Sequence, residues 1–311
     1  MTTIDGHEIK LSHLDKVFFP REGLTKGDLV TYYETVAGVM VPQLRDHPIS
    51  MQRFPDGLNG EGFFNKDAPD YFPDYIKRVK FPKREGGSFD APLVDSAAAL
   101  VYLANQAVLT MHLYLSRTGD LEKPDRMIYD LDPPDETRDY TKVRQAALDI
   151  RGVMEELELK AWVQTTGSQG FHVVIPLDRT ADFDTVRDFA QDVARVLIRR
   201  NPAAYTLEDH IKARQGRIFL DTLRNSYGAT AVAPYSVRAR PQASVATPVE
   251  WDEVEAGVNP RDWTIENLPK RLAQKEDPWR DLMQHPQSLM SRQEKLQGLL
   301  SKEPPAAEEA S

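Results

Sequence analysis

The sequence predicts an α+β fold in which the second half of the chain forms a sheet of four strands crossed by two helices. Three observations predict this class: short apolar runs typical of strands, two segments with helical periodicity, and turn residues between them. In chain order the elements alternate as β-α-β-β-α-β, the arrangement of ferredoxin-like and RRM-like domains. In that topology the first strand lies between the third and the fourth, so side chains on these three strands become neighbours.

The two helices of this unit are expected over about 141–157 and 184–199, because apolar residues recur there at every third or fourth position. The strands are short runs bounded by proline, glycine or polar turns. In chain order they are Met127–Asp132, Ala161–Thr166, Phe171–Leu177 and Arg217–Asp221. All six elements fall within residues 121–285, which we predict to be the second domain.

Residues 1–120 are expected to form a separate mixed α/β lobe. Thr25–Leu44 is predicted to be a helix with its first residue as N-cap, since apolar side chains recur at helical spacing. Pro48–Phe54 is short and apolar, as expected of a strand. The Ala-, Leu- and Val-rich segment Asp95–Leu109 is predicted to be a buried helix, and turn residues predict a loop over Lys83–Pro92.

Composition excludes several classes of protein. The chain has 311 residues and no cysteine, which excludes disulfides, thiolate catalysis and cysteine-bound zinc. No apolar run approaches the roughly 18 residues that a membrane span requires. The first residues show neither the basic head nor the apolar stretch of a secretory signal. We therefore expect a cytoplasmic protein without membrane contact.

The net charge of −9 argues against indiscriminate nucleic-acid binding, which needs lysine and arginine to neutralise phosphates. Some of the acid lies in residues 303–311, the end of a tail over 286–311 that we expect to be helical or disordered. Any contact with nucleic acid is therefore expected from local basic patches.

Three aspartates carry the main chemical signal. Asp130 and Asp132 are two residues apart on the first strand and share one face, about 6.6–6.8 Å apart. Asp221 ends the fourth strand, which neighbours the first. Carboxylates buried together need a cation to balance them, and polymerases use carboxylates to hold two divalent ions about 3.5–4 Å apart. We therefore predict that Asp130, Asp132 and Asp221 are both metal ligands and catalytic residues.

The three aspartates are also compatible with sites of a different kind. An Asp-x-Asp pattern before Pro133 and Pro134 is typical of a solvated turn at a strand end. A metal-dependent glycosyltransferase or a nuclease would use the same three carboxylates. The aspartates alone do not distinguish these proteins.

A candidate phosphate site lies beside the acidic strand. Residues 167–170 are predicted to form a tight turn whose backbone N–H groups and Ser168 hydroxyl suit a triphosphate. His172 follows on the third strand as a hydrogen-bond donor. Arg238 and Arg240 lie on one side of an extended segment, and arginine pairs suit bidentate phosphate binding. An ordinary hairpin turn, a core histidine and a solvated edge strand are the alternatives.

Several segments together resemble the polymerase domain of bacterial DNA ligase D, within the archaeo-eukaryotic primase superfamily. They occur in the family's order, and the run from Phe219 to Trp251 is the most specific. The segments are Leu14–Pro20, Thr25–Asp28, Gly62–Lys66, His112, Asp130–Pro134, Ser168–His172, Phe219–Asn225, Ala229–Arg240 and Pro248–Trp251. The resemblance implies a two-lobed primase-polymerase fold with the ferredoxin-like unit as its catalytic lobe.

The resemblance also implies roles that spacing does not. Lys16 and Lys26 resemble the pocket for the 5′-phosphate of a DNA end, and lysines near a helix N-terminus suit that anion. Phe63 and Phe64 resemble a pair that stacks on the template strand, although their pattern alone would place them in the core. Residues 83–96 resemble a loop that brings two DNA ends together. The residues that resemble those around the incoming nucleotide are His112, Ser168, Gln169, Gly170, His172 and Arg238.

The implied activity is template-dependent nucleotidyl transfer by a DNA or RNA polymerase that fills gaps or extends broken ends, as in non-homologous end joining. The resemblance implies two Mn²⁺ or Mg²⁺ ions, NTP or dNTP substrates with ribonucleotides preferred, DNA ends with a 5′-phosphate, and a Ku-type end-binding partner. The sequence contains no Lys-x-Asp-Gly motif of a DNA ligase. A separate ligase is therefore expected to seal the product, and the protein is expected to act at the nucleoid.

The chain departs from the family's pattern at two positions. Gln169 stands where a basic residue is common, which removes one expected triphosphate contact, and Tyr114 stands where tryptophan is common. A non-catalytic module that binds DNA ends through Lys16 and Lys26 is the alternative function. The clustered carboxylates argue against it, because they are costly to retain without a metal.

Overall fold

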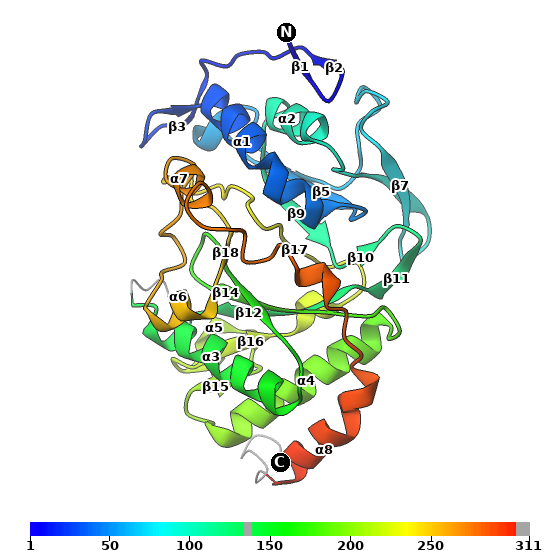
Figure 1. The fold of residues 1–311 in the computed structure, drawn as a ribbon, viewed down its shortest axis with the longest axis vertical. Coiled ribbons are helices and arrows are strands. Elements are labelled where there is room, and N and C mark those ends of the chain that lie inside the picture. Colours follow the sequence, from blue (N-terminus) through cyan, green and yellow to red (C-terminus); the bar gives the residue numbers. More distant parts are fainter. Residues whose placement is uncertain (134–138, 303–311) are drawn as a thin grey trace. The chain divides into compact units, whose positions relative to one another are not determined.

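The computed structural model describes residues 1–133 and 139–302, and the chain divides into two compact units (Figure 1). Pro134 and the expected tail end at 303–311 lie outside the described residues. Each unit is assembled from three segments of the chain. The first comprises residues 1–121, 230–247 and 261–280, and the second comprises residues 122–229, 248–260 and 281–311.

An antiparallel sheet of four strands forms the centre of the first unit, in the order β17-β9-β5-β6. β5 (Ile49–Arg53) pairs with β6 (Phe63–Asn65) on one side and with β9 (Val108–Tyr114) on the other. β17 (Thr230–Val232) pairs with β9 and comes from the later segment of the chain. The strand predicted over Pro48–Phe54 is confirmed as β5.

The helix predicted to start at Thr25 is confirmed as α1 (Lys26–Leu44). The Thr25 side chain accepts a hydrogen bond from the backbone N–H of Asp28, and the Asp28 carboxylate accepts one from the N–H of Thr25. This capping box satisfies two of the backbone donors that a helix start leaves unpaired.

The helix predicted over Asp95–Leu109 was too long. α2 (Ala97–Asn105), with Ser96 as N-cap, is a buried helix as expected, but Ala107 adopts a φ of 62°. A left-handed residue ends a right-handed helix, and the apolar residues that follow pair with β5 as part of β9. Leu109 is therefore a strand residue.

The loop predicted over Lys83–Pro92 was also only partly right. Its second half is β8 (Ser88–Pro92), which pairs with β7 (Arg78–Pro82) in a hairpin. Phe89 stacks on Phe81 across this pair, with ring centroids 5.3 Å apart. The cross-strand aromatic pair stabilises strand pairing that the turn residues alone did not indicate.

The remaining elements of the first unit are short. They are β1 (Thr2–Ile4), β2 (His7–Ile9), β3 (Val17–Phe19), β4 (Leu24–Thr25), η1 (Gly57–Asn59), β10 (Ser116–Arg117) and α7 (Leu268–Leu272). β11 (Asp120–Pro124) pairs with β10 and leads into the second unit.

The second unit is built on a six-stranded sheet of order β15-β16-β12-β14-β13-β18. β12 (Arg126–Asp132) lies between β14 (Phe171–Pro176) and β16 (Ile218–Asp221) and is antiparallel to both. β13 (Trp162–Thr165) pairs with β14. The first strand of the ferredoxin-like unit therefore lies between the third and the fourth, as predicted. The edge strands are β15 (Tyr205–Thr206) and β18 (Thr247–Val249).

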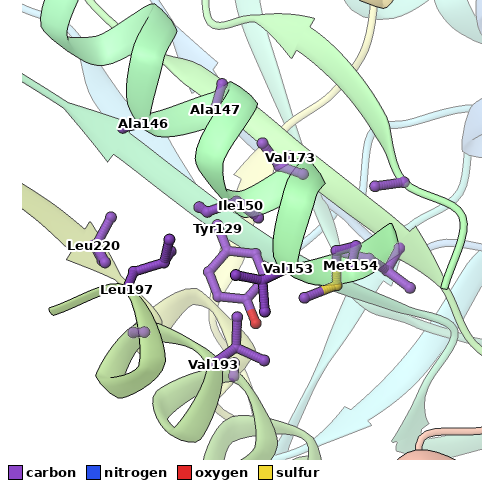
Figure 2. Close-up of a cluster of buried hydrophobic side chains, with 14 of the residues drawn as sticks. Tyr129, Ala146, Ala147, Ile150, Val153, Met154, Val173, Val193, Leu197 and Leu220 are labelled. Carbon is purple, nitrogen blue, oxygen red and sulfur yellow. The ribbon is translucent and has the colours of Figure 1, made fainter. Parts of the chain in front are cut away.

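The predicted helices are confirmed as α3 (Thr141–Glu156) and α4 (Phe183–Arg200), which cover one face of this sheet (Figure 1). Figure 2 shows their apolar side chains meeting Tyr129, Val173 and Leu220 of the strands. Side chains along a strand alternate between faces. The residues next to these three in sequence therefore point to the opposite face of the sheet, away from the apolar core.

The other elements of the second unit follow the strands or lie near the C-terminus. They are α5 (Ile211–Arg214), η2 (Leu223–Asn225), α6 (Trp251–Glu255), η3 (Leu282–Gln284), η4 (Met290–Arg292) and α8 (Gln293–Lys302). In the part of the chain that the structure describes, no helix combines the length and the hydropathy needed to cross a membrane.

Candidate active site

Asp130 lies on the central strand of the second unit, opposite a histidine on one neighbouring strand and an aspartate on the other. Its Cα partner on β14 is His172, and its partner on β16 is Asp221. Asp132, two residues further along β12, shares this face and is exposed at the strand end. The structure thus brings together the four residues that the predicted strand order made neighbours.

Both carboxylate oxygens of Asp130 have partners, and the residue is only 6% exposed. Oδ1 lies 3.3 Å from Nε2 of His172, and Oδ2 accepts a hydrogen bond from Nε of Arg224 at 2.9 Å. The amide Nε2 of Gln164, which can only donate, lies 3.1 Å from Nδ1 of His172. Nδ1 therefore accepts, and Nε2 carries the proton that faces Asp130.

Three residues of this site were not predicted from the sequence: Gln164, Arg224 and Asn225. Asn225 is fully buried and exchanges two 2.8 Å hydrogen bonds with the backbone of Ile128. These bonds fasten η2 to β12 and bring the Arg224 guanidinium to the carboxylates. A signal was present, since an arginine three residues after Asp221 has the spacing of a local ion pair. For Gln164, the signal is a polar residue in a fully buried strand.

The electrostatics of the site show crowded negative charge with partial compensation. Burial, and then the charge of Asp130, raise the pKa of Asp221. Burial also acts to raise the pKa of Asp130, but His172 and Arg224 outweigh it and hold that pKa well below its usual range. Asp130 is thus kept ionised by its two partners, whereas ionised Asp221 is disfavoured.

The turn between β13 and β14 is held by Thr166. Its hydroxyl accepts hydrogen bonds from the backbone N–H groups of Ser168 at 3.3 Å and Gly170 at 3.1 Å. A ligand that used these two N–H groups would have to compete with Thr166. Gly170 is required by space, because a Cβ there would lie 1.8 Å from the carbonyl oxygen of Leu131 and 2.8 Å from Oδ1 of Asp132.

The residues fit divalent cations by chemistry, although their side chains do not converge on one point. Among the described residues, no three acidic or histidine side chains form a ready metal cage. Carboxylate oxygens are nevertheless the ligands that Mg²⁺ and Mn²⁺ prefer. Burial and then the charge of Asp130 raise the pKa of Asp221, and a bound cation would offset both by stabilising the ionised carboxylate. The donor set of Asp130, Asp132 and Asp221 therefore fits such ions.

An exposed aromatic surface lies on β6 of the first unit. Phe63 and Phe64 are 46% and 59% exposed, so they are not core residues. The Phe64 ring meets His112 of β9 edge to face, with centroids 5.6 Å apart, and the Arg53 guanidinium lies 5.7 Å from the Phe63 ring centroid. Arg53 also donates a hydrogen bond to the Tyr71 hydroxyl at 3.0 Å. Exposed aromatic rings with a neighbouring arginine suit nucleobases.

Lys16 and Lys26 are brought together at the start of α1. The backbone N–H of Lys26 donates to the carbonyl of Lys16 at 2.8 Å. The Lys16 ammonium pairs with Asp56 at 2.6 Å, and the Lys26 ammonium, nearly buried, donates to the carbonyl of Ser12 at 2.7 Å. Burial, and then the charge of Lys16, lower the pKa of Lys26. Two lysines therefore meet at a helix N-terminus, and Asp56 offsets the charge of one of them.

Two further predicted residues belong to the first unit. His112 is on β9, in register with Ser50 of β5 and Val232 of β17. Arg238 follows β17 and donates its backbone N–H to the carbonyl of Ser244 at 2.7 Å. The other residues predicted around the nucleotide, 168–170 and His172, belong to the second unit.

Comparisons of sequence show which known proteins this chain resembles. The chain is 34% identical over 275 residues to the multifunctional non-homologous end joining protein LigD of Pseudomonas aeruginosa, which covers 88% of this chain and 32% of that protein. It is 29% identical over 281 residues to the bifunctional non-homologous end joining protein LigD of Bacillus subtilis, covering 90% of this chain and 45% of that protein. The chain thus spans less than half the length of these relatives.

A solved structure agrees with the fold. The polymerase domain from Mycobacterium tuberculosis ligase D in complex with DNA matches with a TM-score of 0.84 and 29% identity, over 90% of this chain and 99% of that one. The family model described as LigD, primase-polymerase domain, matches residues 25–279. The chain therefore belongs to the LigD primase-polymerase domain family, and it is an enzyme of the nucleotidyltransferase class.

Proposed function

We propose that this chain is a template-dependent polymerase that adds nucleotides to a 3′-hydroxyl at gaps or broken DNA ends. The observation that carries the proposal is the direct pairing of Asp130 with Asp221 on adjacent strands, with Asp132 on the same face. The relatives from P. aeruginosa and B. subtilis are named for non-homologous end joining. We propose the same repair process for this chain, acting at the nucleoid in the cytoplasm.

Bound to these three aspartates, two divalent cations (Mn²⁺ or Mg²⁺) would lower the pKa of the 3′-hydroxyl and offset the charge of the leaving pyrophosphate. The chain's own residues position the reactants. Backbone pairing fixes the separation of Asp130 and Asp221, and the Nε2 proton of His172 orients Asp130. We assign the incoming nucleotide to His112, Ser168, Gln169, Gly170, His172 and Arg238.

The first unit supplies the proposed DNA contacts. Lys16 and Lys26 would bind the 5′-phosphate on the far side of a gap, since their backbones are hydrogen-bonded at a helix start and the charge of Lys16 acts on Lys26. Phe63 and Phe64 would stack on template bases, which their exposure supports. A preference for ribonucleotides, a Ku-type end-binding partner and a separate ligase complete the proposal, all on the basis of the family resemblance.

Primer extension on gapped DNA with Mn²⁺ tests this function. Substrates with and without the 5′-phosphate, each offered NTPs or dNTPs, separate recognition of the end from the choice of sugar. Extension is expected to fall to background in Asp130→Ala with Asp132→Ala. The matched control is Asp184→Ala with Asp188→Ala, two exposed acidic residues on α4 that should leave extension unchanged. Extension by the first double variant at the wild-type rate would refute the assignment.

A non-catalytic module that binds DNA ends is the second candidate. One observation favours it: Arg224 already neutralises Asp130 without any metal. It predicts binding that depends on the 5′-phosphate, without nucleotide incorporation under any metal condition. Incorporation by the wild type with Mn²⁺ would exclude this candidate.

A further inference from the structure

Arg224 occupies the position in the active site where a cation is expected. Its Nε lies 2.9 Å from Oδ2 of Asp130 and 3.8 Å from Oδ2 of Asp221. One guanidinium therefore bridges the two carboxylates that face each other across β12 and β16. With His172 on Oδ1, both oxygens of Asp130 are engaged.

The electrostatics of Arg224 match this bridging position. Burial acts to lower its pKa, but Asp130 and Asp221 outweigh burial and raise it. The pKa of Asp221 is raised by burial first and then by the charge of Asp130, and the guanidinium lies where it offsets the second of these causes. A guanidinium has no lone pair to offer a metal, and its charge repels a cation held a few ångströms away. Arg224 therefore disfavours a metal ion on Oδ2 of Asp130, and a metal ion there disfavours the contact with Arg224.

The local structure allows Arg224 to leave without unfolding its surroundings. The side chain is 43% exposed, so one side of it already faces solvent. η2 is also held on β12 by the buried Asn225, whose two hydrogen bonds to the backbone of Ile128 do not involve Arg224. The guanidinium can therefore rotate outward while the backbone of η2 stays in place.

We propose that Arg224 is a built-in counter-cation of the active site, which neutralises Asp130 and Asp221 before metal arrives and competes with metal for Asp130. The inference rests on the proposed function, because it takes Asp130 and Asp221 as metal ligands. Arg224 is thus expected to have two opposite effects: it stabilises the metal-free fold, and it weakens metal binding. An arginine that merely oriented the carboxylates for metal would have the opposite effect on metal affinity.

The test compares Arg224→Gln with the wild type in two measurements that do not depend on activity. Mn²⁺ alone is titrated into the protein, with free ion followed by electron paramagnetic resonance. Melting temperatures are then measured with a chelator and with Mn²⁺. Arg200→Gln is the matched control, since Arg200 is also an arginine paired with a carboxylate, that of Glu156, but it lies on α4, which packs on the opposite face of the sheet.

Arg224→Gln is expected to bind Mn²⁺ about tenfold more tightly, the scale of one charge-assisted hydrogen bond. It should melt below the wild type in chelator and gain more from Mn²⁺ than the wild type does. Arg200→Gln should leave Mn²⁺ affinity unchanged. Arg224→Lys keeps the charge but loses the planar guanidinium, so its Mn²⁺ affinity should lie between those of the wild type and Arg224→Gln. This variant tests the competition if Arg224→Gln does not fold.

The outcomes separate this inference from the proposed function. If the wild type binds Mn²⁺ and Arg224→Gln, or Arg224→Lys in its place, binds it equally or more weakly, the competition is refuted and the metal site stands. If neither the wild type nor the variants bind Mn²⁺, the metal site and this inference fail together.

Discussion

The ionised form of Asp221 is disfavoured in the folded protein. Burial in the second unit, and then the charge of Asp130, raise the pKa of this carboxyl. A carboxyl whose pKa is raised by folding lowers the free energy of unfolding at neutral pH. The reason is that the ionised carboxylate is less stable in the folded protein than in the unfolded chain. Such residues are typical of sites where chemistry needs them. Stability and activity should therefore respond to substitution here in opposite directions.

Asp221→Asn is expected to raise the melting temperature in chelator by about 2 °C, the scale of a 1 kcal/mol change in a unit of this size. The Asn Oδ1 can still accept the 2.7 Å hydrogen bond from the N–H of Leu223, so only the charge is lost. Nucleotide incorporation should disappear in the same variant. Thermal melting and primer extension check the two effects. A variant that melts below the wild type would show that Asp221 stabilises the metal-free fold.

If Lys26 binds the 5′-phosphate as proposed, its lowered pKa predicts that DNA-end binding depends on pH. A phosphate dianion beside Lys26 would raise that pKa again, so the complex holds more protons than the free protein once the pH exceeds the free pKa. Affinity for a 5′-phosphate end should therefore be constant near neutral pH and fall as pH rises through the lowered pKa, below the 10.5 of an ordinary lysine.

Fluorescence anisotropy on gapped DNA between pH 7 and 10 measures this effect. The same DNA with a 5′-hydroxyl is the control and should show a flat profile. Lys26→Arg should flatten the profile for the phosphorylated DNA, because arginine stays charged over this range. Identical slopes for phosphorylated and hydroxyl ends would exclude Lys26 from phosphate binding.

At the scale of elements, the ferredoxin-like unit could be predicted because its signals are local. α3, α4 and the strands between them each combine regular periodicity with a nearby turn, and the chain order then determines the sheet order. The end of α2 could not be predicted, because its apolar composition continues unbroken into β9 while Ala107 changes conformation. β8 depends on a cross-strand partner, Phe81, that local composition does not reveal.

The active site shows the same division between local and tertiary information. The aspartates were predictable, since strand alternation and sheet order place them together. Arg224 and Asn225 were not, because η2 has only three residues and its position depends on two hydrogen bonds to Ile128, which is distant in sequence. Gln164 reaches His172 only through its register on the neighbouring strand, which its place in the sequence does not reveal.

The turn between β13 and β14 provides a prediction at this scale. Gly170→Ala would force a Cβ into the carbonyl of Leu131, so the end of β12 that carries Asp132 must shift. We expect a loss of about 1–3 kcal/mol in the free energy of unfolding and about 100-fold in extension rate, since misplacement by an ångström costs that much. Urea unfolding and single-nucleotide extension measure the two losses.

Gly152→Ala is the control for this substitution. Gly152 lies within α3, and a Cβ at this residue would meet nothing within 4 Å. Alanine is favoured over glycine in a helix by about 0.5–1 kcal/mol, so this variant should be slightly more stable and equally active. If Gly170→Ala behaved like Gly152→Ala, the close approach of the turn to β12 would not matter for function.

At the scale of the whole chain, DNA binding has to overcome a net charge of −9. General attraction to phosphates is therefore weak, and binding must depend on a few local features. We expect the lysine pair at α1 to supply one, and the exposed rings of β6 to supply another that does not depend on charge. Affinity for gapped DNA should consequently fall less steeply with salt than that of a basic DNA-binding protein of similar size.

The aromatic contribution can be isolated because Phe63 and Phe64 are 46% and 59% exposed. Their joint replacement by alanine removes little core packing, so the melting temperature should change by less than about 2 °C. Stacking on bases is worth about 1–3 kcal/mol per base, so affinity for gapped DNA should fall at least tenfold by anisotropy. Met290→Ala, at a similarly exposed apolar residue on η4, is the control and should change neither quantity. A large drop in melting temperature, with DNA affinity kept, would show that the two rings stabilise the fold and do not bind the template.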